Sequence, residues 1–65
     1  MSPEEKRTYL DSQIACALIE MESMKAMNYE RDAQGLAQAY NEEAFLDLIE
    51  KYGIHHNAVI GWFHD

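Results

Sequence analysis

The stretch that decides the fold is LIEKYGIHHNAVIGWFHD, residues 48–65, in which a helical apolar pattern is interrupted once, at Gly53. Leu48 continues an apolar stripe up to that point, and glycine suits the left-handed position that ends many helices. After the glycine, Val59 and Trp62 recur at helical spacing. The stretch therefore predicts two helices joined by a tight turn.

This stretch resembles helices two and three of the homeodomain family, whose pattern runs leucine, glycine, an aliphatic residue, valine and then Trp-Phe. In that family the second position after the Phe is an Asn that pairs with adenine, and a basic run follows it. Here that position holds Asp65 without a basic run, and an aspartate repels phosphates. The resemblance implies a degenerate helix-turn-helix scaffold, over the last third of the chain, that has lost DNA readout. The residues that carry it are Leu48, Gly53, Ile54, Val59, Trp62 and Phe63.

The charge balance also argues against nucleic acid as a partner. The 65 residues include 12 acidic and 5 basic side chains, for a formal net charge of -7, and no Lys or Arg falls in the last expected helix. A nucleic-acid surface needs such residues against the phosphates. A DNA-mimic inhibitor of a nucleic-acid-binding protein is the alternative, although the acids are spread around all the helices. A weak DNA-binding transcriptional regulator is the least favoured class.

The N-terminal half predicts one long helix. Ser2 suits the cap position, Pro3 suits the first turn, and Glu5 faces the positive end of the helix dipole. Neither Gly nor Pro follows until Gly35, so we expect a helix over about residues 3–31. At 1.5 Å per residue it would span on the order of 40 Å, more than the remaining residues can cover.

That helix carries two apolar stripes, and so small a domain needs a further source of stability. Cys16 is the only cysteine, which excludes an intramolecular disulfide. We therefore expect a homodimer, in which one stripe packs on the chain's own C-terminal helices and the other on a second copy. A monomer with one broad core face is the alternative. We predict that the first stripe forms the dimer interface, although the choice between the stripes stays open. The first stripe is Leu10, Ile14, Ala17, Leu18, Met21 and Met24, and the second is Tyr9, Cys16, Ile19 and Met27.

The remaining residues predict two more helices. Turn-forming residues mark a break at 31–35, after which an apolar stripe predicts a helix over about 36–52. Asn41 is an alternative start, because it is a good cap and two glutamates follow it. Residues 36–40 would then form a separate turn. The third helix is expected to begin near Asn57 or up to three residues earlier.

The sequence predicts neither an enzyme nor a metal or cofactor site. His55 and His56 are adjacent, so their side chains diverge by about 100° on a helix, and His64 lies two turns beyond His56. Cys16 has no base near it in sequence and is expected to be a small buried apolar residue. Trp62 is expected to pack into the core.

The function that these features favour is a small acidic homodimeric protein-interaction and regulatory protein. It would be one all-α domain over residues 1–65, with a long N-terminal helix followed by a helix-turn-helix-like hairpin. The acidic surface favours a protein partner with a basic surface, and the third helix offers that partner His55, His56 and Ile60. No apolar run approaches membrane-spanning length, so a cytoplasmic location is expected. Size, acidity and helical content are typical of phage-encoded accessory proteins.

Overall fold

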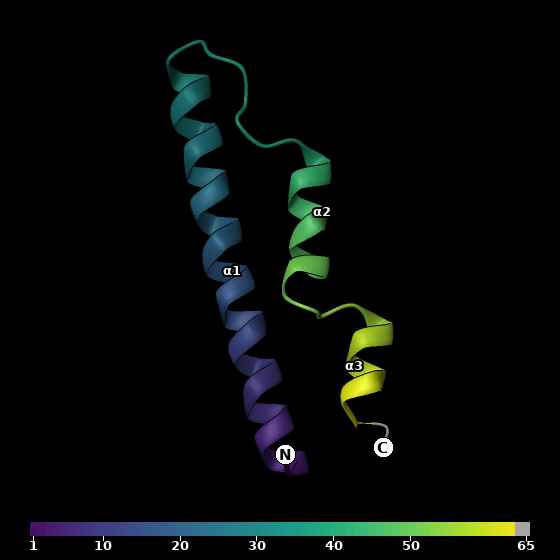
Figure 1. Cartoon of the computed structure of the whole chain (residues 1–65). Helices are drawn as coiled ribbons and strands as arrows, with labels where there is room; N and C mark the ends of the chain where they lie inside the picture. The colour runs from purple at the N-terminus through teal and green to yellow at the C-terminus, as the bar shows by residue number, and fades with distance from the viewer. Residues whose placement is uncertain (64–65) are drawn as a thin grey trace.

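The computed structural model describes residues 1–63, apart from the side chains of Asn57, Trp62 and Phe63. The described chain forms three helices and no strand: α1 over Pro3–Ala33, α2 over Glu42–Lys51 and α3 over His56–Phe63. The predicted all-α fold with a long N-terminal helix is confirmed. In Figure 1, α1 is a long rod, and α2 and α3 follow one another back along it. The expected burial of Trp62 concerns a side chain outside the described residues.

The start of α1 follows from its first five residues. The Ser2 hydroxyl accepts a hydrogen bond from the Glu5 backbone N–H at 3.1 Å, and the Ser2 backbone N–H donates to Glu5 Oε1 at 3.2 Å. This reciprocal pair satisfies two backbone donors that the helix would otherwise leave open, and Pro3 has no donor to satisfy. The predicted start of the helix is confirmed.

The end of α1 comes two residues after the predicted position. The helix continues to Ala33, and Gly35 then takes a left-handed φ of 74°. Just after that glycine, the Leu36 backbone N–H donates to the Arg31 carbonyl at 2.8 Å, which occupies one of the acceptors at the helix end. The chain is thereby reversed toward α2.

The connection between α1 and α2 corrects one sequence prediction. A helix over 36–52 is wrong at its start, and the alternative start at Asn41 is confirmed, because Asn41 Oδ1 accepts from the Ala44 backbone N–H at 2.9 Å. The backbone before it pairs with side chains of α1 instead. Asn28 donates to the Tyr40 carbonyl at 2.8 Å and accepts from the Tyr40 N–H at 2.9 Å. These contacts replace the helical hydrogen bonds that the apolar stripe predicted.

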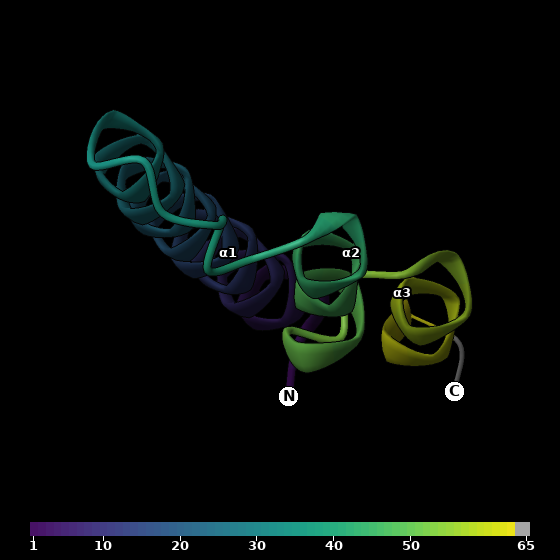
Figure 2. The same ribbon diagram turned by 90° about the horizontal axis from the view of Figure 1, so that it is seen from above.

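The turn between α2 and α3 has the expected glycine geometry. Gly53 has a φ of 61°, and the Ile54 N–H donates to the Ile49 carbonyl at 3.0 Å. His55 then caps α3, because its Nδ1 accepts from the Ala58 backbone N–H at 3.2 Å. Both short helices contact α1, and Figure 2 shows them on one side of it.

The direction of α2 and α3 bears on the homeodomain resemblance. In Figure 1 the two helices run in the same general direction alongside α1. The two helices of a DNA-binding helix-turn-helix instead cross steeply. The arrangement therefore adds no support to the helix-turn-helix-like hairpin, which stays a prediction.

The core is thin and the molecule is elongated. Among the described side chains the buried apolar ones are Ala17, Met24 and Leu48, which are 7%, 5% and 7% exposed. The chain measures 50 × 18 × 10 Å, and its radius of gyration is 15.2 Å. A compact domain of this length would have a radius of gyration of about 11 Å. Burial within the chain is thus well short of what a compact fold achieves.

Candidate functional site

The contact between α1 and α2 is organised around one buried line on α1. Ala17 and Met24 lie two turns apart on the same side of the helix, and Leu48 is the buried residue of α2. Because successive residues are 100° apart, Glu20 lies on one side of this line and Leu18 on the other. The two edges of the contact therefore carry different chemistry.

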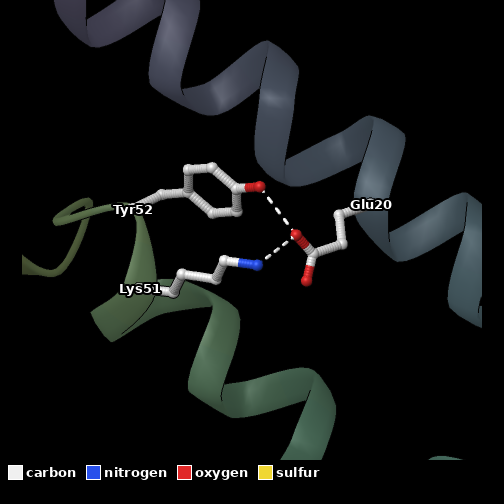
Figure 3. A network of polar contacts seen from close by, with 3 residues as sticks. All are labelled: Glu20, Lys51 and Tyr52. Atoms are coloured by element: carbon white, nitrogen blue, oxygen red, sulfur yellow. Dashed lines mark hydrogen bonds and ion pairs between the residues drawn. The ribbon is translucent and has the colours of Figure 1, made fainter.

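The first edge is polar and closed. Glu20 Oε1 accepts hydrogen bonds from Lys51 Nζ at 2.6 Å and from the Tyr52 hydroxyl at 2.7 Å, as Figure 3 shows. Gln13 Nε2 donates to the Tyr52 carbonyl at 3.2 Å. We call Gln13, Glu20, Lys51 and Tyr52 the polar clasp. It joins the middle of α1 to the C-terminal end of α2.

The protonation states of the clasp support one another. Hydrogen bonds from Lys51 and Tyr52 lower the pKa of Glu20, because they stabilise the carboxylate. The same carboxylate raises the pKa of Lys51, and it raises the pKa of Tyr52 by accepting the phenol's hydrogen bond. At neutral pH the clasp therefore holds a carboxylate, an ammonium and a neutral phenol. These shifts move each group away from neutral titration, so the clasp suits a structural role.

The second edge is apolar and open. A hollow of about 310 Å³ lies between α1 and α2 on this side. Leu18 and Leu46 are 52% and 56% exposed at its border, and Ile49 is 39% exposed. We call this surface the apolar groove. Its lining residues are Ala17, Leu18, Met21, Phe45, Leu46, Leu48, Ile49 and Ile54.

Carboxylates flank the apolar groove along both helices. Glu22 follows Leu18 by one turn on α1, while Glu42 and Glu50 lie one turn before and one turn after Leu46 on α2. Glu22 is paired with Lys25 at 3.1 Å. The borders are therefore acidic while the lining is apolar.

The structure divides the six residues that the sequence predicted for a dimer interface. Two are buried inside the chain, two are half-buried, and two are exposed. The exposed pair is one turn apart and lies on the groove side of α1, and the residues of the second stripe are all exposed. The buried pair is Ala17 and Met24, the half-buried pair is Leu10 and Met21, and the exposed pair is Ile14 and Leu18.

Cys16 corrects a further expectation. It was predicted to be a buried apolar residue, and its side chain is exposed. The reason is angular: one residue before Ala17, its side chain points about 100° away from the buried line. Apolar spacing along α1 did not distinguish the covered side from the uncovered one.

The three residues predicted to bind a partner are in different situations. His55 is half-buried, caps α3, and has its Nε2 at 3.6 Å from Glu50 Oε2. His56 and Ile60 are exposed one turn apart on α3. The structure thus gives His55 a local structural contact and leaves the other two at the surface.

Among the described residues, no group of three His, Cys, Asp or Glu side chains could hold a metal ion. Within that same part of the chain, no helix combines the length and apolar character needed to cross a membrane. Comparison with known proteins found no matching family model, curated protein or solved structure.

Sequence reasoning missed the polar edge of the α1–α2 contact and the α2 side of the apolar groove, although Ala17, Leu18 and Met21 of the groove were in the predicted dimer interface. The clasp joins residues more than thirty positions apart, and no local pattern relates Glu20 to Lys51 or Tyr52. The groove had a signal on α2, because Leu46 falls outside the apolar stripe of its own helix. An apolar residue off the stripe of an amphipathic helix indicates a second contact surface.

Proposed function

We propose that this chain is a small acidic protein-interaction and regulatory protein that associates with another polypeptide through the apolar groove. The observation that carries the proposal is the exposure of Leu18, Leu46 and Ile49 around one hollow contributed by two helices. Single exposed apolar residues are ordinary, whereas a cluster with polar borders is typical of interaction surfaces. The groove supplies the binding area, and its borders influence the choice of partner.

Charge supports a partner that is not nucleic acid. The chain carries a net charge of -7, and Glu22, Glu42 and Glu50 each lie one helical turn from Leu18 or Leu46 of the groove. An acidic surface of this kind repels phosphates. Weak or absent binding of duplex DNA stays a prediction, which a gel shift with mixed-sequence duplex at low salt tests. Sequence-specific nanomolar binding would overturn the proposed function and favour a DNA-binding regulator.

The third helix offers a second, smaller surface for the same function. His56 and Ile60 are exposed on it, as the predicted partner-binding role requires, but they do not line the groove. We place the principal contact at the groove because it combines three exposed apolar side chains from two helices. A phage accessory role for the protein stays a prediction from its size, acidity and helical content.

The experiment compares tagged full-length chains for association with proteins from the cells in which the chain occurs. Leu18→Glu and Leu46→Glu each introduce a carboxylate at the groove. Ile19→Glu is the matched control, because Ile19 is 71% exposed and lies about 100° from Leu18 around the helix. We expect a partner bound by wild type to be lost from both groove variants and retained by the control.

Two outcomes of this experiment would contradict the proposal. If every protein captured by wild type is captured equally by both groove variants, the groove is not the interaction surface. Before association is measured, circular dichroism checks that each variant is helical. Equal loss with all three variants would indicate a general effect of added charge and would likewise contradict the proposal.

A further inference from the structure

This inference rests on the proposed function, because it names the partner at the apolar groove. We infer that the groove is covered by the same groove of a second copy, in a symmetric homodimer. In such a dimer each copy contributes Leu18 and Leu46 to the other, and the two contact surfaces are identical. The exposed edge of α1 then lies against both α1 and α2 of the second copy.

The surface area of the chain has the size that such a dimer requires. The accessible surface is 5088 Å². A compact monomer of this mass would expose about 4,200 Å². The surplus of roughly 900 Å² is close to the area of about 800 Å² that one partner contributes to an interface of standard size. A second copy is thus large enough to remove the surplus.

The thin core points to a partner that is always present. Three described apolar side chains are buried, and no described side chain is less than 2% exposed. Domains below about 70 residues usually add disulfides, a metal or oligomerisation to such a core. The single cysteine excludes an internal disulfide, and the described residues hold no metal-binding cluster. A second copy accompanies the chain whenever it is made, whereas a different protein need not.

The charges of the groove borders make the dimer respond to salt in a characteristic way. Each copy has a net charge of -7, so two copies repel one another. The Glu22 carboxylate is partly offset by Lys25 at 3.1 Å, which reduces the repulsion at one border. Added salt screens the remainder and should strengthen the dimer. Association with a basic partner would instead weaken with salt, so the direction of the salt effect distinguishes the two occupants.

The test is sedimentation equilibrium of the full chain over a range of micromolar concentrations. We expect wild type to have twice the chain mass of 7.5 kDa, with a dissociation constant that falls as salt increases. Leu18→Glu and Leu46→Glu should each raise that constant by about 100-fold or more, because each places an unpaired charge in the interface. Ile19→Glu adds the same charge away from the groove and should leave the constant within a few-fold of wild type.

The outcomes separate this inference from the proposed function. A wild-type monomer at tens of micromolar overturns the homodimer, and so does a dimer that both groove variants leave intact. If wild type is monomeric while the groove variants lose a captured partner, the homodimer is wrong and the proposed function stands. Should a Glu variant fail to fold, Leu46→Gln and the salt titration of wild type decide the question. A dimer that weakens as salt increases contradicts the inference without any variant.

Discussion

The two edges of the α1–α2 contact differ in how well their side chains are satisfied within the chain. On the polar edge, Glu20 accepts hydrogen bonds from Lys51 and Tyr52, at the C-terminal end of α2, at distances of 2.6 and 2.7 Å. On the apolar edge, Leu18 and Leu46 remain more than half exposed. A polar group is satisfied by one or two well-placed atoms, whereas an apolar side chain must be covered by area. The ten residues of α2 provide the former but not the latter.

The edges therefore serve different purposes. In the polar clasp Lys51 is exposed and Glu20 is half-buried, so solvent weakens their ion pair, and the clasp mainly determines where the end of α2 lies on α1. In the apolar groove Leu18 and Leu46 stay more than half exposed, so covering them with the proposed partner would be favourable. The polar edge thus positions α2 on α1, and the apolar edge provides the area that the proposed partner would bury.

The largest expected effect comes from the buried residue of α2 that lies between the two edges. Leu48→Ala removes the buried side chain of α2, and we expect it to lower the free energy of unfolding by about 2–5 kcal/mol. That is a large part of the stability of so small a domain. Urea unfolding followed by circular dichroism, at one fixed protein concentration, measures it. Leu36→Ala is the control, because Leu36 is exposed before α2 and its truncation should change stability by about 0.5 kcal/mol or less. Equal effects would mean that the thin core is not centred on Leu48.

A smaller effect is expected where polar contacts alone hold the chain. Asn28→Ala removes both hydrogen bonds to the Tyr40 backbone and should lower the free energy of unfolding by about 1–2 kcal/mol. Hydrogen exchange of the Tyr40 amide should become faster, because its acceptor is lost. Gln38→Ala, at an exposed position of the same connection, is the control. An unchanged Tyr40 amide would show that α2 is positioned without this contact.

The smallest effect concerns the polar clasp and is seen best as a function of pH. The pKa of Glu20 is lowered by Lys51 and Tyr52, so its stabilising contribution is present above the unfolded-state pKa and is lost as the pH falls through the folded-state value. We expect Glu20→Gln to lower the melting temperature slightly at neutral pH, and the difference from wild type to shrink below about pH 4.

The alkaline side has the opposite sign. The pKa values of Lys51 and Tyr52 are raised, so their contributions are present below the unfolded-state values and are lost as the pH rises through the folded-state ones. Thermal melts of wild type and Glu20→Gln across pH test both limbs. Glu22→Gln, which removes an exposed i,i+3 pair with Lys25, is the control and should show little pH-dependent difference. A difference from wild type that is constant across acidic pH would contradict the clasp as described.

Local chemistry made much of the fold predictable from the sequence. The start of α1 at Ser2, the left-handed Gly53 and the alternative start of α2 at Asn41 all depend on contacts within a few residues. Such contacts form whatever the rest of the chain does. The same reasoning failed for residues 36–40, where the competing partners, Asn28 and Arg31, come from α1. An apolar stripe indicates a helix only while no better partner for its backbone is near.

By itself, the sequence determined an acidic all-α chain whose long first helix has apolar residues on more than one side. Spacing along a helix sets which residues share a side, because 100° per residue is a local property. Only the tertiary structure decided which sides are covered: it buried Ala17 and Met24, exposed Cys16, closed one edge with Glu20 and left the other open at Leu18. Those outcomes depend on where α2 meets α1, which is set by contacts between residues far apart in the chain.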